Sequence, residues 1–106
     1  MKVIVKYPGE RLGHYAEVEN DLAEIQKLVG GFIETVTLSK TAVLICDEEG
    51  YIKNRKFNCY INNGYSHFMF LGTVVVAGVD GDEFTDCEMT LEEWGRMIDG
   101  EEQDLD

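Results

Sequence analysis

Hydrophobic and polar residues alternate with a period of two in several short stretches of this chain, which is the pattern of half-buried β-strands. Residues 1–7 alternate lysine with valine and isoleucine, and a second extended stretch is predicted over residues 14–18. Residues 73–79 are rich in β-branched side chains and predict a strand that is buried on both faces.

Two further pairs of strands are predicted to form local hairpins. Residues 32–38 alternate and precede the short apolar run of residues 42–46, with a Ser-Lys pair suited to a tight turn between them. Asn-Asn-Gly at residues 62–64 separates residues 57–61 from residues 65–70. Because Asn and Gly both tolerate positive φ, this motif is a strong hairpin signal.

Two short amphipathic helices are predicted from apolar residues at helical spacing. The first helix follows Asn20, which is the predicted N-cap, and residues 30–31, a Gly-Gly pair, end it. It is expected to cover one face of the sheet. Thr90 and Glu93 form a capping box ahead of the second helix, which Gly100 is predicted to end.

Length and composition fit a single domain. A chain of 106 residues with 44% hydrophobic residues can build one core and is too apolar for general disorder. The predicted class is therefore α+β, a small, mostly antiparallel sheet with two short helices over residues 1–100, followed by a disordered acidic tail at residues 101–106. The longest apolar run, residues 71–79, is about half of a membrane helix, and residues 1–7 lack a signal-peptide core, so we expect a cytoplasmic protein without membrane contact.

No pattern in the sequence predicts an enzyme, a metal site or a cofactor. The three cysteines form an odd set without a CxxC pair, which favours reduced thiols over disulfides or zinc. Acids at alternate positions from Asp80 resemble the start of a calcium-binding loop, but Thr85 stands where glycine is required and Leu91 where glutamate is required. His14 and His67 lie in no catalytic spacing.

Net charge is concentrated in the last quarter of the chain. Residues 80–106 hold twelve acids against one base, whereas residues 1–79 hold 9 acids and 8 bases. One interpretation is a solvated segment that keeps the protein soluble. The other is an ordered carboxylate surface that imitates the phosphate rows of nucleic acid, which carry about one charge per 1.7 Å. The residues predicted to bind the basic surface of a host nucleic-acid-binding protein are Asp80, Asp82, Glu83, Asp86, Glu88, Glu92, Glu93 and Asp99.

Positive charge clusters at residues 53–56, among aromatic side chains and shortly after residues 47–50, which are predicted to be a polar turn. Such a mixture can stack a base and pair its phosphate. The plainer interpretation is an exposed loop and edge strand whose lysines discourage aggregation. The alternative site for a small nucleotide, held in a pocket of a possible homodimer, comprises Tyr51, Lys53, Arg55, Lys56 and Tyr60.

Three stretches carry a resemblance to a known family: Leu-Val-Gly-Gly-Phe-Ile-Glu at residues 28–34, Asp-Glu-Glu-Gly at residues 47–50, and Leu-Gly-Thr-Val-Val-Val at residues 71–76 with Thr-Leu-Glu-Glu at residues 90–93. Together they resemble an uncharacterised domain-of-unknown-function family found mainly in phages, prophages and conjugative elements, in which a VGG-[FY]-[IV]-E block is most specific. The resemblance implies no catalytic residues. It implies a small accessory protein of a mobile element.

These observations lead to an expected function in counter-defence. We expect a non-enzymatic accessory protein that inhibits a host nucleic-acid-targeting defence system through its acidic surface, without binding nucleic acid directly. The step from mobile element to counter-defence is an association and not a physical argument. Two alternatives stay open, a sponge that sequesters a nucleotide immune signal and a housekeeping accessory domain with incidental acidity.

Overall fold

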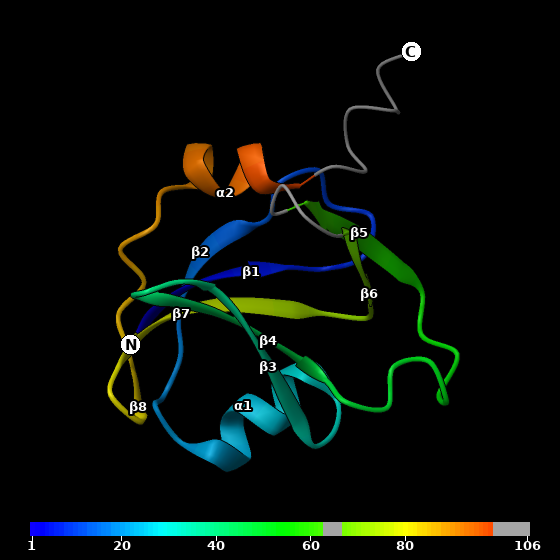
Figure 1. Ribbon diagram of the computed structural model, residues 1–106. Helices are drawn as coiled ribbons and strands as arrows, with labels where there is room; N and C mark the ends of the chain where they lie inside the picture. The colour runs from blue at the N-terminus through cyan, green and yellow to red at the C-terminus, as the bar shows by residue number, and fades with distance from the viewer. Residues whose placement is uncertain (63–66, 99–106) are drawn as a thin grey trace.

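The computed structural model describes residues 1–62 and 67–98 (Figure 1). In chain order, the elements are β1 (Lys2–Lys6), β2 (His14–Glu17), α1 (Leu22–Val29), β3 (Ile33–Ser39), β4 (Ala42–Asp47), β5 (Phe57–Asn62), β6 (His67–Leu71), β7 (Val74–Asp80), β8 (Glu83–Thr85) and α2 (Leu91–Met97). The predicted α+β class with two short helices is confirmed. Neither helix of the described chain has the length and apolar character needed to cross a membrane.

The main sheet has six strands and is larger than the small sheet predicted. Its order is β2-β1-β7-β4-β3, with β8 also paired to β7, and β5 and β6 form a separate two-stranded sheet. Every pairing among these strands is antiparallel. Both predicted hairpins are confirmed as strand pairs, with Val36 opposite Leu44 and Ile61 opposite Phe68. Most of the predicted Asn-Asn-Gly turn lies outside the described residues.

Both faces of the central strand β7 are covered, which explains its continuous apolar sequence. Val75 and Ala77 belong to a core cluster that includes Ile25 and Val29 of α1. Val76, on the opposite face, packs in a second cluster with residues of β5, β6 and α2. Figure 1 shows α1 on one side of the main sheet and α2 with the β5–β6 hairpin on the other. The expectation that the first helix covers one face is therefore confirmed.

The first helix begins one residue later than predicted. Asp21, and not Asn20, is the N-cap, since its side chain accepts a 2.8 Å hydrogen bond from the Ala23 N–H. Asn20 instead donates its side-chain amide to the carbonyl of Phe84, 2.8 Å away. Asn and Asp are nearly equivalent as caps, so the sequence alone could not separate the two neighbours. Gly30 ends the helix with φ +94°, as predicted.

The second helix is held by the predicted capping box and by a buried tryptophan. The Glu93 N–H donates to the Thr90 hydroxyl at 3.1 Å, and the Glu93 carboxylate accepts from the Thr90 N–H at 2.9 Å. Trp94 is fully buried, and its indole N–H donates to the carbonyl of Leu12 at 2.8 Å. The helix ends at Met97, earlier than the predicted stop at Gly100, because Ile98 is extended and bridges to β5. Gly100 and the predicted acidic tail lie outside the described residues.

Candidate functional site

Seven of the eight acids predicted to bind a partner lie in the described chain, and all seven are exposed. They follow the chain from the end of β7, through β8, to the first turn of α2. Figure 1 shows this segment running along one side of the molecule from β8 to α2. We call this set the acidic edge: Asp80, Asp82, Glu83, Asp86, Glu88, Glu92 and Glu93. The eighth predicted residue, Asp99, lies outside the described residues.

The backbone of the acidic edge is fixed by hydrogen bonds to distant parts of the chain. The Cys87 N–H donates to the carbonyl of Lys2 at 2.7 Å, and the Lys2 N–H donates to the Asp86 carboxylate at 2.8 Å. Near α2, the Leu91 N–H donates to the Tyr15 hydroxyl at 2.9 Å. Because these bonds join the segment to β1 and β2, its carboxylates are displayed on ordered structure.

The carboxylates of the acidic edge differ in how far they are already engaged. Asp86 binds the backbone of β1, Glu93 closes the capping box, and Glu92 forms an exposed ion pair with Arg96 at 3.4 Å. Among the described residues, no hydrogen bond or ion pair engages the side chains of Asp80, Asp82, Glu83 and Glu88. Within the same residues, no group of three or more potential ligands is arranged to hold a metal ion.

The turn of the β3–β4 hairpin adjoins the acidic edge. Thr41, in this turn, and Glu88 together line two neighbouring hollows of about 260 and 340 Å³. Asp86 lines one of these hollows and Glu93 the other. Both hollows are partly open to solvent, so this part of the described chain offers a partner an accessible face.

The predicted polar turn at residues 47–50 proved to contain a buried carboxylate. The Asp47 side chain is fully buried and lies 3.0 Å from the Lys53 ammonium and 3.3 Å from the Arg55 guanidinium. Both cations also donate to the carbonyl of Gly30, at 3.1 and 2.9 Å, where α1 ends. The pair therefore ties the loop after β4 to the negative end of the α1 dipole. Sequence reasoning missed this role because the partners are separated along the chain.

The pKa of the Asp47 carboxyl reflects this environment. Burial alone would raise this pKa, because it disfavours the charged form. Hydrogen bonds from the Glu49 N–H and the Lys53 ammonium, with the charges of Lys53 and Arg55, outweigh burial and hold the pKa below its usual range. Asp47 is therefore charged at neutral pH and holds both cations.

The other residues of the alternative nucleotide site are distributed over different surroundings. Lys56 is exposed, and Tyr60 packs against Phe57 with ring centroids 5.1 Å apart. Tyr51, which is 65% exposed, lines a cleft described below. Lys53 and Arg55 do lie close together, as the nucleotide site requires. They are held there by Asp47 and by the carbonyl of Gly30 at the end of α1.

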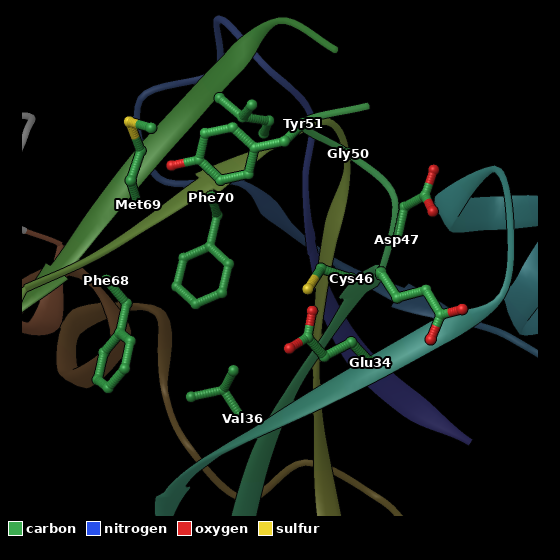
Figure 2. Close-up of a pocket in the computed structure, with 11 residues that line it drawn as sticks. Glu34, Val36, Cys46, Asp47, Gly50, Tyr51, Phe68, Met69 and Phe70 are labelled. Carbon is green, nitrogen blue, oxygen red and sulfur yellow. The ribbon is translucent and has the colours of Figure 1, made fainter. Parts of the chain in front are cut away.

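A cleft of about 200 Å³ opens between the main sheet and β6. Figure 2 shows Val36, Phe68 and Phe70 pointing into one space, with the Glu34 carboxylate beside the Cys46 thiol. Burial, with the nearby charges of Glu34 and Asp47, raises the pKa of Cys46 to about 12, so this thiol is protonated at neutral pH. The cleft is not predictable from the sequence, because its walls come from separate segments.

The chain belongs to a family of uncharacterised domains. Residues 1–99 match the model of the family described as "Domain of unknown function (DUF3846)". The match confirms that the chain belongs to an uncharacterised domain family, as its resemblance in sequence had indicated. No curated protein and no solved structure gave a significant match to the chain.

Proposed function

We propose that this protein is a non-enzymatic inhibitor that binds the basic surface of a nucleic-acid-binding protein through its acidic edge. The observation that carries this proposal is that seven exposed carboxylates stand on a backbone fixed to β1 and β2. A partner evolved to bind phosphates attracts concentrated negative charge, and carboxylates on an ordered backbone present it without the entropy cost of ordering a tail.

We further propose that such an inhibitor acts against the defence proteins of a host cell. A small accessory protein of a phage or other mobile element, working in the host cytoplasm, meets nucleic-acid-targeting defence proteins with basic channels. Blocking such a channel requires no catalytic group, only charge and shape. The link to mobile elements is a resemblance of sequence, and it selects the class of partner.

The nucleotide-sponge alternative has weaker support in the geometry. A phosphate held by Lys53 and Arg55 would have to displace the carboxylate of Asp47, which lies within 3.3 Å of both cations. That exchange would leave a buried carboxylate unpaired, which is costly. The acidic edge needs no such rearrangement, because four of its side chains have no partner within the described residues.

The test removes charge from the acidic edge without touching its structure. In one variant, Asp80→Asn, Asp82→Asn and Glu88→Gln neutralise three unengaged carboxylates. A matched control, Glu17→Gln with Glu24→Gln and Glu49→Gln, removes the same number of charges from β2, from α1 and from the loop after β4. Asp86 and Glu93 are left intact because they hold the backbone of the edge.

Parent, variant and control are each immobilised and exposed to bacterial lysate at about 50 mM and about 200 mM salt, with and without added duplex DNA. We expect parent and control to capture nucleic-acid-binding proteins at low salt, and added DNA to release them. The edge variant should lose this capture. Equal capture by the edge variant, or capture that DNA does not compete, would contradict mimicry and leave acidity as an aid to solubility.

A further inference from the structure

The cleft between β3 and β6 is a second candidate surface, independent of the acidic edge. Its volume of about 200 Å³ is below the roughly 300–1,000 Å³ of pockets that enclose a small-molecule ligand. It is open to solvent along the exposed rings of Tyr51 and Phe68. A space of this size and openness accommodates one or two side chains of a macromolecular partner better than a whole nucleotide.

The lining of the cleft is apolar inside and acidic outside. Val36, Cys46 and Phe70 supply apolar surface, and Figure 2 shows Tyr51 reaching across toward Met69. The charged side chains of the lining are all acids, namely Glu34, Asp47 and Glu48. Asp47 points away from the cleft (Figure 2). Its negative charge is balanced by the ion pairs with Lys53 and Arg55.

The remaining two acids are available to a partner. Glu34 and Glu48 are exposed, and no hydrogen bond or ion pair engages either carboxylate among the described residues. An occupant of this cleft must therefore combine an apolar group with a positive charge.

The strand geometry sets the spacing of those two groups. Glu34 and Val36 are alternate residues of β3, so they project from the same face of the strand about 6.6 Å apart. In an extended peptide, residues i and i+2 also share one face at that spacing. β3 and β6 are each the last strand of their sheet within the described chain, as is common where an extended segment docks.

We propose that this cleft binds an extended segment of a partner protein that carries an aliphatic side chain and, two residues away, an arginine or lysine. The aliphatic group lies against Val36 and Phe70, and the cation lies against Glu34. Two other occupants fit less well. The C-terminal residues 99–106 are themselves acidic, and a second copy of the chain brings a net charge of −12.

The test is a titration of the isotope-labelled full chain with the peptide acetyl-Thr-Leu-Thr-Arg-Thr-amide, followed through the backbone amide signals. We expect signals of Val36, Cys46 and Phe70 to shift, while those of Asp82 and Glu88 stay in place. A peptide with Glu in place of Arg should not bind.

Matched variants separate a site from general attraction. Glu34→Gln should weaken peptide binding about two- to fivefold, the size expected for one exposed ion pair. Glu24→Gln, an equal change of charge on α1, should have no effect. Val36→Thr should weaken binding by adding a hydroxyl to the apolar wall while keeping the size of the side chain.

Each of the other outcomes would overturn the proposal. Shifts confined to the acidic edge would show that the peptide binds by charge alone. Equal losses of peptide affinity in Glu34→Gln and Glu24→Gln would likewise show attraction by net charge alone. Shifts in the cleft that depend on protein concentration without peptide would assign it to a second copy, and no shift at millimolar peptide would leave it empty.

Discussion

The buried carboxylate of Asp47 gives the sharpest test of how this fold is held together. Asp47→Asn keeps the size of the side chain and removes its charge, so no cavity complicates the result. The change leaves Lys53 and Arg55 facing an amide, at the point where both also bind the carbonyl of Gly30. The loop after β4 should therefore be held less tightly against the end of α1.

The size of the effect follows from the exposure of the three side chains. Removing one partner of a fully buried ion pair costs about 3–5 kcal/mol. Here only Asp47 is fully buried, whereas the Lys53 and Arg55 side chains are 33% and 36% exposed and can be rehydrated. We therefore expect a loss of about 2 kcal/mol in the free energy of unfolding, the range of a hydrogen bond to a charged group.

The pH dependence of this loss has a definite sign. The pKa of Asp47 is lowered in the folded protein, so its contribution is fully present above the unfolded pKa of about 3.9. The contribution disappears as pH falls through the folded pKa, because the carboxyl is then protonated in both states. The asparagine variant has no such proton, so the stability difference between parent and variant must narrow in acid.

The free energy of unfolding of parent and variant is measured at pH 7 and near pH 3 by urea unfolding. The fluorescence of Trp94, the single tryptophan, follows the transition. Glu49→Gln is the matched control, because Glu49 lies 3.8 Å from Lys53 but is 45% exposed. This control should cost less than about 0.5 kcal/mol. A loss of unfolding free energy in Asp47→Asn no larger than that of the control at pH 7 would contradict this role of Asp47. A loss that stays the same near pH 3 would contradict it as well.

Two other side chains allow equally direct tests. Trp94→Ala should lower the free energy of unfolding by about 3–5 kcal/mol, since the ring is fully buried and its N–H donates to the carbonyl of Leu12. Circular dichroism in urea measures this loss, and a value below about 1 kcal/mol would contradict the packing of the ring. Cys46, whose pKa is raised to about 12, should stay protonated at pH 7.5 and resist iodoacetamide until urea unfolds the chain. Mass spectrometry of the modified peptides locates the alkylated thiol, and alkylation of native Cys46 at the unfolded rate would contradict this burial.

The elements that the sequence predicted well are those specified by neighbouring residues. The capping box at Thr90 and the glycine stop at Gly30 each need only a few consecutive positions, and both are present. The β3–β4 hairpin likewise follows from strand alternation on either side of a short turn. Local patterns of this kind depend little on the rest of the fold.

The features that the sequence did not predict depend on residues distant in the chain. Asp47 and Arg55 lie eight positions apart, and Arg55 also donates to the carbonyl of Gly30, at the end of another element. Nothing in a run of acids followed by bases shows that one carboxylate will be buried between two cations. The helix end at Met97 depends on a bridge from Ile98 to Ile61, which is also a tertiary contact.

The β3–β4 hairpin connects the two candidate surfaces and separates them. Its turn, at Thr41, borders the acidic edge, whereas its open end, at Glu34, borders the cleft. The seven residues of β3 span about 20 Å at 3.3 Å per residue. Charges this far apart lie beyond the Debye length of about 8 Å at physiological salt, and substitutions at such a distance usually act additively. A partner that used both surfaces would therefore lose the two contributions independently, and a partner of the acidic edge alone would be insensitive to changes in the cleft.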